Sequence, residues 1–355
     1  MKGLILAGGD GRRLRPLTHT NAKQLVPIAN KPILHYVIDD LIEVGVNDLG
    51  IVVGETAEEI VSSVGDGSAW GAKITYIEQD KPLGLAHAVL VSNSFLKGDP
   101  FVMYLGDNMF EDSLDSVIAE FDPNLASARL LLARVEDPSA FGVAQLDING
   151  RVVELTEKPE APLSDLALVG VYLFGSRIHD AVRNIKPSNR GELEITDAIQ
   201  WLIDAEEIVE HRVLDGWWID TGKKDPLLKC NELVLDRIVT LIDGEVDKES
   251  VIEGPVIVEA SSVVENSIIK GPVVVGPGAR ITNSTVGPYV SVGSGCNIDH
   301  SFVDRTVLMD RSRILDVTRG VTGSVLGRET EVIGSRKGDL SISVLLGDNS
   351  IVDFS

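Results

Sequence analysis

The chain has 355 residues and is acidic: 32 lysines and arginines stand against 54 aspartates and glutamates, a formal net charge of −22. A field of this sign repels nucleic acid polymers and anionic bilayers, so we expect neither as a partner. Hydrophobic residues make up 44% of the chain, enough for a substantial core. The length predicts two domains, because single cores rarely exceed about 250–300 residues.

Two features lead us to expect a cytoplasmic protein. The two cysteines, Cys230 and Cys296, lie far apart without metal-ligand spacing, which is typical of a reducing compartment. No apolar run reaches the length of about 18 residues that a membrane span needs, and the first residues lead into a strand pattern rather than a signal peptide.

The N-terminal part alternates short apolar runs with stretches of helical spacing. This alternation predicts a doubly wound, mostly parallel α/β sheet with helices on both faces, and ligands then bind at the carboxyl ends of the strands. A helix over residues 225–241 is expected to connect this part to the C-terminal part of the chain. The predicted strands are Gly3–Ala7, Ile51–Val53, Ile74–Ile77 and Phe101–Leu105, and the predicted helices are Ile33–Val44, Ala57–Val64 and Leu85–Leu96.

From about Glu249 onward, apolar residues recur at every sixth position, with Gly, Pro, Asn and Ser between them. This period fits neither a helix nor a hairpin and predicts a parallel β-helix with one inward residue on each flat side. The predicted domains are therefore residues 1–240 and 241–355. The recurring residues are Val251, Ile257, Val263, Ile269, Val275 and Ile281, continued with one five-residue step by Val286, Val292 and Ile298.

The first predicted strand runs into a glycine-rich turn, Gly8-Gly9-Asp10-Gly11. Such a turn lets backbone N–H groups approach phosphates, but it lacks the third Rossmann glycine and the Gly-Lys-Ser/Thr of a P-loop. Cationic residues follow it at once: Arg12, Arg13 and Arg15, then Lys23. A plain tight turn needs no such cluster, whereas a polyphosphate does, although Arg12 and Arg15 also fit solvated surface charges.

These residues carry a family resemblance. AGGDGRRLRPLT followed by Lys23-Gln24-Leu25-Val26-Pro27 resembles the signature of sugar-1-phosphate nucleotidylyltransferases. The resemblance implies a Rossmann-like nucleotidyltransferase domain, followed in long-form members by a left-handed β-helix. It also implies that the loop wraps a triphosphate, that Arg13 assists the departing pyrophosphate and that Lys23 contacts phosphates. The family usually has threonine at position 12, so Arg12 loses or replaces a hydroxyl contact.

Further stretches extend the resemblance on the nucleotide side. Residues 79–86, QDKPLGLA, are similar to the family's base-recognition segment, in which Gln79 bonds the pyrimidine edge and Gly84 lets the base lie close. Asp107 and Asp220 match its two metal ligands, and carboxylates in such small number suit Mg²⁺. By this match the catalytic residues are Arg13, Lys23 and Asp107, and the nucleotide-binding residues are Leu6, Gly8, Gly9, Gly11, Arg12, Arg13, Gln79, Pro82, Gly84 and Asp107.

On the sugar side, residues 191–197, GELEITD, resemble the thymidylyl branch of the family, which implies dTTP and glucose 1-phosphate as substrates. Glu157 is then expected to accept hydrogen bonds from the sugar hydroxyls, and Lys158 and Arg190 to hold the sugar phosphate. Phe141 stands where the family commonly has tyrosine, so a hydroxyl role there does not carry over. The implied sugar-phosphate residues are Asn108, Gly142, Glu157, Lys158, Gly170, Tyr172 and Arg190.

The chemistry implied is a single displacement without a covalent enzyme intermediate. A phosphate monoester is largely dianionic at neutral pH, with its second pKa near ~6, so it needs no general base. The transfer does need charge relief and in-line placement.

We consider three alternatives. Uridylyl transfer is the nearest, because bases that differ by one methyl are separated by only ~1–3 kcal/mol. Acetyl transfer on the β-helix would use His300, whereas the plainer interpretation of that domain is a homo-oligomerisation module, for example a trimer. An inactive regulatory subunit would lack the matched arginine, lysine and aspartates, all of which are present.

Overall fold

The computed structural model describes residues 1–9, 11–334 and 341–353, so Asp10 of the predicted glycine turn lies outside the described residues. Its contacts divide the chain into two units. Unit 1 comprises the described residues of 1–10 and 34–218, and unit 2 those of 11–33 and 219–355. The division groups residues 11–33 with the C-terminal part of the chain. The domain bounds 1–240 and 241–355 stay a prediction.

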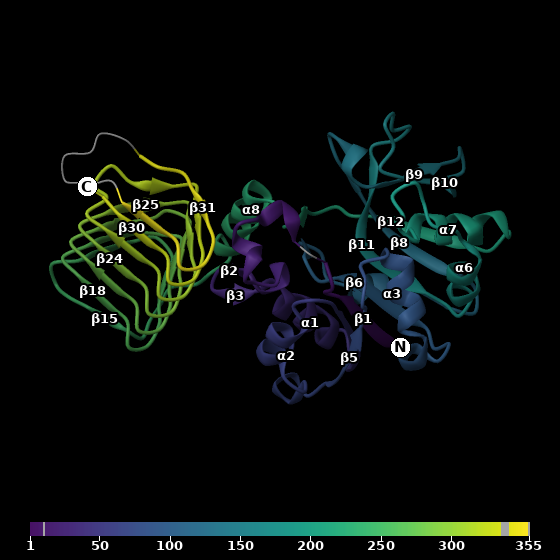
Figure 1. Ribbon diagram of the computed structural model, residues 1–355, viewed down its shortest axis with the longest axis horizontal. Helices are drawn as coiled ribbons and strands as arrows, with labels where there is room; N and C mark the ends of the chain where they lie inside the picture. The colour runs from purple at the N-terminus through teal and green to yellow at the C-terminus, as the bar shows by residue number, and fades with distance from the viewer. Residues whose placement is uncertain (10, 335–340, 354–355) are drawn as a thin grey trace. The chain divides into compact units, whose positions relative to one another are not determined.

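Unit 1 is built on one nine-stranded sheet (Figure 1). Seven of its strands follow the order β10-β9-β11-β6-β1-β4-β5, while β8 pairs with β11 and β12 pairs with β8. β1 pairs in parallel with β4 and β6, whereas β11 runs antiparallel to β6, so the sheet is mixed. The α/β fold class is confirmed. The strands are β1 (Lys2–Leu6), β4 (Asp48–Val53), β5 (Lys73–Glu78), β6 (Phe101–Leu105), β8 (Ala128–Arg134), β9 (Gly142–Leu146), β10 (Val152–Glu157), β11 (Leu166–Phe174) and β12 (Val209–Val213).

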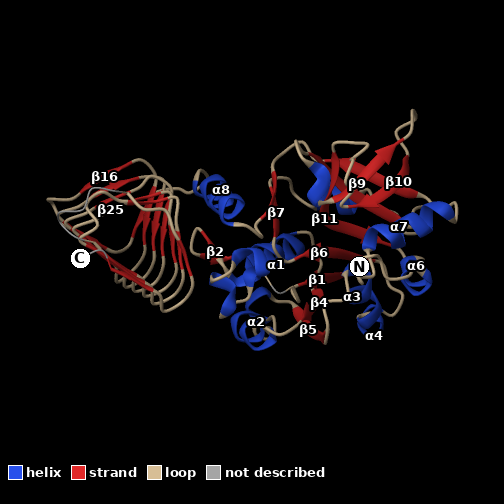
Figure 2. Cartoon of the chain, turned by 45° about the horizontal axis from the view of Figure 1, so that its top comes forward, coloured by secondary structure: helices blue, strands red, loops and turns tan. Residues whose placement is uncertain are grey.

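Helices cover both faces of this sheet (Figure 2). Leu4 and Leu6 of β1 belong to a buried cluster with residues of α3, α6 and α7. Gly3, which points to the opposite face, lies against α1, since a Cβ there would stand 3.2 Å from Leu41 Cδ1. The helices are α1 (Ile33–Glu43), α2 (Ala57–Val64), α3 (Leu85–Val91), α4 (Asn93–Leu96), α5 (Asp115–Ala119), α6 (Ile178–Asn184) and α7 (Ile195–Asp204).

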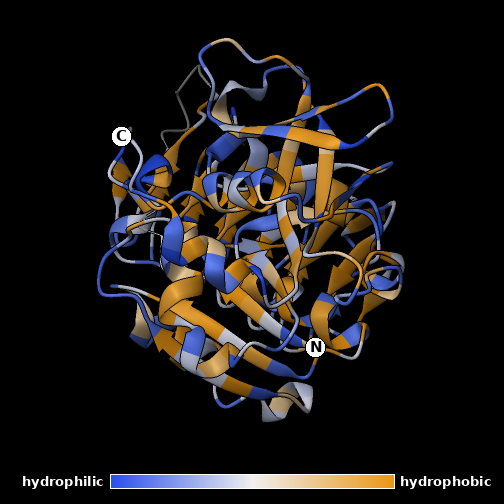
Figure 3. Ribbon diagram, turned by 90° about the vertical axis from the view of Figure 1, so that its right-hand side faces the viewer, coloured by the Kyte–Doolittle hydropathy of each residue, from blue (hydrophilic) through white to orange (hydrophobic). Residues whose placement is uncertain are grey.

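The sequence explains these layers. Helix α7 buries Ile195, Ala198, Ile199 and Leu202, which repeat at the three- and four-residue spacing of one helix face. Strand β11 is buried along its whole length, as its unbroken apolar run requires. Figure 3 shows the same distribution, with mostly hydrophobic strands inside the unit.

Unit 2 begins with residues 11–33, which we call the cationic segment because they contain Arg12, Arg13, Arg15 and Lys23. The segment has little regular structure. It consists of three short 3₁₀ turns and a hairpin whose tip, Ala29 and Asn30, has the two positive φ angles of 47° and 64° that a tight turn needs. The elements are η1 (Arg12–Leu14), η2 (Leu17–His19), η3 (Lys23–Leu25), β2 (Pro27–Ile28) and β3 (Lys31–Pro32).

The C-terminal part of unit 2 is the left-handed parallel β-helix, preceded by β13 (Trp218–Asp220), where the division between the units falls, and α8 (Lys224–Leu235). Two seven-stranded sheets and one five-stranded sheet form its sides. The first is β14 (Leu241–Ile242), β17 (Val256–Val258), β20 (Val273–Val275), β23 (Val290–Val292), β26 (Val307–Leu308), β29 (Val325–Leu326) and β31 (Leu345–Leu346). The second is β15 (Glu245–Val246), β18 (Val263–Glu265), β21 (Arg280–Thr282), β24 (Asn297–Asp299), β27 (Arg313–Leu315), β30 (Glu331–Ile333) and β32 (Ile351–Asp353). The third is β16 (Val251–Glu253), β19 (Ile268–Lys270), β22 (Thr285–Val286), β25 (Phe302–Asp304) and β28 (Val321–Thr322).

The inward positions correct the predicted six-residue pattern. Ile269, Val275 and their predicted successors are fully buried, but Val251 is 47% exposed. The prediction is wrong for Val251, Ile257 and Val263, because the buried residues in these coils include Val258 and Val264. The reason is the coil length: Val251 pairs with Ile268 and Val256 with Val273, in both cases 17 residues later, so a coil in this region has two six-residue sides and one five-residue side. A strict six-residue spacing slips by one position per coil.

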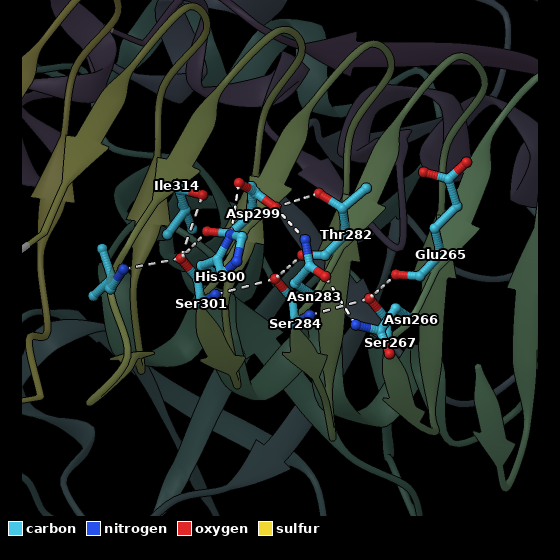
Figure 4. A network of polar contacts seen from close by, with 11 residues as sticks. Glu265, Asn266, Ser267, Thr282, Asn283, Ser284, Asp299, His300, Ser301 and Ile314 are labelled. Carbon is cyan, nitrogen blue, oxygen red and sulfur yellow. Dashed lines mark hydrogen bonds and ion pairs between the residues drawn. The ribbon is translucent and has the colours of Figure 1, made fainter. Parts of the chain in front are cut away.

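One corner of the β-helix is a ladder of equivalent residues (Figure 4). Asn266, Asn283 and His300 occupy the same place in successive coils, with φ angles of 45°, 50° and 45°. The serines that follow them stack as well, since the Ser284 amide donates to Ser267 Oγ at 3.1 Å. The Ser301 amide donates to Ser284 Oγ at the same distance of 3.1 Å. These bonds satisfy backbone donors that the turn leaves unpaired.

Among the described residues, no helix is both long and apolar enough to cross a membrane.

Candidate active site

The predicted nucleotide-binding residues of unit 1 begin at the carboxyl end of β1. The Gly106 amide donates to the Leu6 carbonyl at 3.0 Å, and the loop continues through Gly8 and the exposed Gly9. A Cβ on Gly8 would stand 3.4 Å from Gln79 Oε1. Gln79 is buried, and its side-chain amide contacts the Gly84 carbonyl at 3.3 Å and His87 Nδ1 at 2.9 Å. Gly8, from the predicted phosphate turn, and Gln79, from the predicted base-recognition segment, therefore lie together at this edge of the sheet.

Gly84 joins the predicted base-recognition segment to residues 191–197, which carry the predicted sugar-side motif. Its φ is 104°, and a Cβ would stand 2.3 Å from the Leu193 carbonyl oxygen. The Leu193 amide donates to the Leu83 carbonyl at 2.7 Å, and the Ala86 amide donates to the Leu193 carbonyl at 3.1 Å. Only glycine fits here, because two backbones meet at this point. Pro82, in the same segment, is exposed.

Asp107 lies two residues after the end of β6 and is 6% exposed. Asn108 begins β7 (Asn108–Phe110) and is held from two sides. Its Nδ2 donates to Asp107 Oδ1 at 3.1 Å, and its Oδ1 accepts from Trp218 Nε1 at 2.7 Å. The Trp218 ring packs edge-on against Phe141 at 4.9 Å between centroids. This chain of contacts fixes the amide of Asn108.

Glu157, at the end of β10, is the centre of a polar group that contains the predicted sugar-phosphate residues Lys158 and Arg190. Its Oε1 lies 3.3 Å from both Lys158 Nζ and Arg190 Nη1, and its Oε2 accepts from Thr196 Oγ1 at 3.3 Å. Arg190 also pairs with Glu192 at 2.8 Å. Two cations therefore converge on one carboxylate, and both side chains remain partly exposed.

Three further predicted residues lie beside Glu157 or Asn108. Tyr172 of β11 is buried, and burial together with the negative charge of Glu157 raises the pKa of its hydroxyl. A Cβ on Gly142 would stand 3.2 Å from Glu157 Oε2. Gly170 has a φ of 75°, and its Cβ would stand 3.0 Å from Asn108 Oδ1. Neither glycine leaves room for a side chain between the strands and the polar group.

Unit 2 contains further residues that we predict to contact phosphates, and these lie in the cationic segment. Gly11 has a φ of 61°, its carbonyl accepts from Thr18 Oγ1 at 2.7 Å, and a Cβ there would crowd Lys23 Cβ at 3.2 Å. Arg13 is half-exposed, and its Nη2 lies 3.1 Å from Asp220 Oδ2. Arg12 is exposed, and Lys23 is half-buried.

Comparisons with known proteins decide the family. The family model described as "Nucleotidyl transferase" matches residues 2–237. The family model described as "GlmU-like, C-terminal hexapeptide" matches residues 242–319. The chain belongs to the nucleotidyl transferase family. Similar relatives carrying the name glucose-1-phosphate thymidylyltransferase come from Streptomyces griseus, 49% identical over 100% of both chains, and Streptomyces antibioticus, 49% identical over 99% of both. A solved structure of a putative glucose-1-phosphate thymidylyltransferase from Bacillus anthracis, in complex with a sucrose, is 37% identical with a TM-score of 0.62. It covers 66% of this chain and 94% of its own.

Nucleotidyl transferases acting on sugar phosphates generally use a divalent metal, and Asp107 of unit 1 and Asp220 of unit 2 are the predicted ligands. Asp107 presents a buried carboxylate. In Asp220, Oδ1 accepts from the Gly222 amide at 2.9 Å and Oδ2 pairs with Arg13. In the part of the chain that the structure describes, no three His, Cys, Asp or Glu side chains gather as a metal cluster. Hard oxygen donors in so small a number suit a cation that completes its shell with water and phosphate oxygens.

Sequence reasoning assigned no role to Trp218, His87 or Thr196, which contact Asn108, Gln79 and Glu157 respectively. Thr196 lies inside residues 191–197 and Trp218 stands two residues before Asp220, so these stretches were the available signal. His87 had none, because only the fold brings it to Gln79.

The fold accounts for the two cysteines and for His300 without a catalytic role. Cys230 and Cys296 are both buried, and burial raises the pKa of each thiol to about 12, so neither is a thiolate at neutral pH. His300 takes the corner position that Asn266 and Asn283 take in earlier coils, and its Nδ1 lies 2.9 Å from Asp299 Oδ2.

Proposed function

We propose that this nucleotidyl transferase moves a thymidylyl group from dTTP to glucose 1-phosphate, giving dTDP-glucose and pyrophosphate. The convergence of Lys158 and Arg190 on Glu157 supports the sugar phosphate as acceptor. Such a cluster offers two cations to a phosphate and one carboxylate to hydroxyl donors. The relatives' names and the 49% identity over full-length chains support thymidylyl transfer and glucose.

The groups of the chain act by placement and charge. Gly8, Gly9 and Gly11 admit the triphosphate to backbone N–H groups, and Gln79 hydrogen-bonds the base above Gly84. Leu6, Pro82 and Arg12 complete the nucleotide side. Arg13 and Lys23 neutralise the charge that accumulates on the departing pyrophosphate. Gly142, Gly170, Tyr172 and Asn108 shape the sugar side around Glu157.

The acceptor phosphate is the nucleophile. It is already dianionic near neutral pH, so no side chain removes a proton from it. Lys158 and Arg190 hold it against the repulsion of the nucleotide and direct one oxygen in line with the α-phosphorus. The oxygen–phosphorus bond to pyrophosphate breaks as the new bond forms, without a covalent enzyme intermediate.

We propose that the divalent metal is Mg²⁺ and that Asp107 and Asp220 hold it. The bound ion would neutralise phosphate charge, a contribution that carboxylate ligands and phosphate oxygens together allow.

The β-helix supports assembly into a homo-oligomer, for example a trimer. Val251 and Ile268 are register partners on its five-stranded side, and they are 47% and 39% exposed. An apolar pair on a flat side fits self-association. Light scattering that gives the mass of a single chain would contradict it.

A substrate grid tests the proposed reaction. Pyrophosphate release is measured for dTTP, UTP, CTP, ATP and GTP against glucose 1-phosphate, galactose 1-phosphate and glucosamine 1-phosphate. We expect the highest kcat/KM for dTTP with glucose 1-phosphate, and UTP second. Preference for a purine nucleotide, or release that does not depend on a sugar phosphate, contradicts the proposal.

A further inference from the structure

The cationic segment needs external contacts to keep its shape. Residues 11–33 form only short 3₁₀ turns and one two-residue hairpin. Fixing each backbone residue costs roughly 1–2 kcal/mol of conformational entropy, which so few internal bonds do not offset. Arg13 and Lys23 are thus carried on a chain that is held in place by the elements against which it packs. Within unit 2, these are the β-helix and α8.

The first anchor is Asp348, in the turn after β31. Its Oδ2 accepts from Thr20 Oγ1 at 3.0 Å and from Asn21 Nδ2 at 2.8 Å. Asn21 is 1% exposed. Next to it, a Cβ on Gly347 would stand 2.8 Å from the Pro16 carbonyl oxygen. Backbone of the last coil thus lies directly against the segment between Arg13 and Lys23.

The second anchor holds the hairpin tip. Asn231 of α8 is 1% exposed, and its Oδ1 accepts from the Ala29 amide at 2.8 Å and from Ser291 Oγ at 2.7 Å. Asn30 Nδ2 donates to the Val292 carbonyl at 2.7 Å. A Cβ on Gly276 would stand 3.1 Å from that same Nδ2. The hairpin tip is therefore bonded to α8 and to β23, and the missing side chain of Gly276 leaves room for Asn30 there.

We propose that the β-helix is a positioning element of the nucleotidyl transfer site, and that Asp348 is a positioning residue that fixes the cationic segment between Arg13 and Lys23. The inference rests on the proposed function in one respect, that these two cations bind the triphosphate. Preorganised charges stabilise a transition state only while they stay in place, and a displacement of ~1 Å can cost up to ~10²-fold in rate. The β-helix thereby enters catalysis without touching a substrate.

A matched pair of residues separates this role from coil stability. Asp348 Oδ1 also caps the coil below by accepting from the Arg328 amide at 2.7 Å. Asp310 makes the same kind of cap, accepting from the Ser294 amide at 3.0 Å. Asp348→Ala removes a cap and the anchor, whereas Asp310→Ala removes a cap alone. Thr20→Val removes a donor to Asp348 and leaves the coil caps intact.

The experiment compares these three full-length variants with the wild type. Steady-state kinetics with dTTP and glucose 1-phosphate are combined with hydrogen exchange of residues 11–33. We expect Asp348→Ala to lower kcat about tenfold or more and to raise KM for dTTP, with KM for glucose 1-phosphate unchanged. Hydrogen exchange of residues 11–33 should be faster than in the wild type in Asp348→Ala and, to a smaller extent, in Thr20→Val. Asp310→Ala should match the wild type in both measurements.

Wild-type kinetics and exchange in Asp348→Ala would overturn the inference, as would equal losses in Asp310→Ala. If Asp348→Ala does not fold, Thr20→Val decides, and unchanged exchange there also overturns it. Failure of the proposed function is distinguishable, because the wild type would then release no pyrophosphate while the exchange data would still report on the anchor.

Discussion

Arg13 and Asp220 form an ion pair, with Nη2 and Oδ2 3.1 Å apart. The side chain proposed for the leaving pyrophosphate thus contacts a carboxylate proposed for the metal. Arg13 is 52% exposed, so the pair is partly solvated and contributes only about 0–1 kcal/mol. Arg13 can therefore exchange Asp220 for a phosphate at little cost in free energy. Gly222 leaves room for the guanidinium, since a Cβ there would stand 2.7 Å from Arg13 Nη2.

Arg13→Ala should lower kcat by about 10²-fold, because charge stabilisation on a transferring phosphate is worth several kcal/mol. Pyrophosphate release at saturating dTTP and glucose 1-phosphate measures this. Arg134→Ala is the control, since it removes an exposed Arg–Asp pair, to Asp165 at 2.8 Å, elsewhere in the chain. Equal turnover of the two variants would remove Arg13 from the mechanism.

Asp107→Asn should raise the Mg²⁺ concentration needed for half-maximal activity by about 10–100-fold, because an amide oxygen is a weaker ligand than a carboxylate. A Mg²⁺ titration of activity provides the measurement. The exposed Asp165→Asn variant should titrate like the wild type. An unshifted midpoint for Asp107→Asn would refute its role as a ligand.

Glu157→Gln should raise KM for glucose 1-phosphate by about 10–100-fold, because hydrogen bonds to a charged group contribute about 1.5–3 kcal/mol. KM for dTTP should stay unchanged, since Glu157 contacts Lys158, Arg190 and Thr196 on the sugar side. Glu154→Gln, at an exposed position of the same strand, is the control. A rise in KM for dTTP alone would assign Glu157 to the wrong substrate.

Gly84→Ala should destabilise the protein and raise KM for dTTP. The added Cβ would stand 2.3 Å from the Leu193 carbonyl, so the base-recognition segment must shift. We expect a loss of about 2–3 kcal/mol in urea unfolding from overpacking and strain. Gly98→Ala is the comparison, since its φ is 79° and no heavy atom lies within 4 Å of its Cβ. Equal losses would mean that the contact with Leu193 is unimportant.

Asp299 should make the β-helix sensitive to acid. Partial burial opposes ionisation, but hydrogen bonds from Thr282, His300 and Asn283 outweigh it and lower the pKa of Asp299 from 3.8 to about 2. A lowered pKa means that the stabilisation is present above pH 3.8 and is lost as the pH falls towards about 2. We expect the wild type to have a free energy of unfolding about 1 kcal/mol higher than Asp299→Asn above pH 3.8, once solvent screening is allowed for. This difference should shrink as the pH falls from 3.8 to about 2. An advantage that stays constant in denaturant unfolding would contradict the assignment.

Local patterns in the sequence predicted much of the fold. Phe101–Leu105 and Ala57–Val64 form the strand and the helix that were predicted, with the same ends, because an unbroken apolar run and a periodic one are signals within a few residues. The six-residue period also predicted the β-helix, but it did not predict correctly which residues point inward in the first coils. Counted from Val251, the period placed Val251, Ile257 and Val263 inside, although Val258 and Val264 are the buried residues. The five-residue side is revealed only by the pairing of Val256 with Val273, 17 residues later.

The site was predictable as motifs but not as contacts. Gln79, Asp107 and Glu157 stand in recognisable stretches, whereas their partners are far along the chain. Trp218 reaches Asn108 across 110 residues, and Asp348 reaches Thr20 across 328. No periodicity encodes such pairs, because they depend on how strands and coils are stacked. The same limit hid the anchoring of the cationic segment.

The most direct test of the central claim is a product balance. The full-length protein is incubated with dTTP, glucose 1-phosphate and Mg²⁺, and nucleotide sugar and pyrophosphate are quantified together. The account predicts dTDP-glucose and pyrophosphate in equal amounts, formed only when both substrates are present. Pyrophosphate formed without nucleotide sugar, or no product from dTTP while another nucleotide reacts, would contradict it.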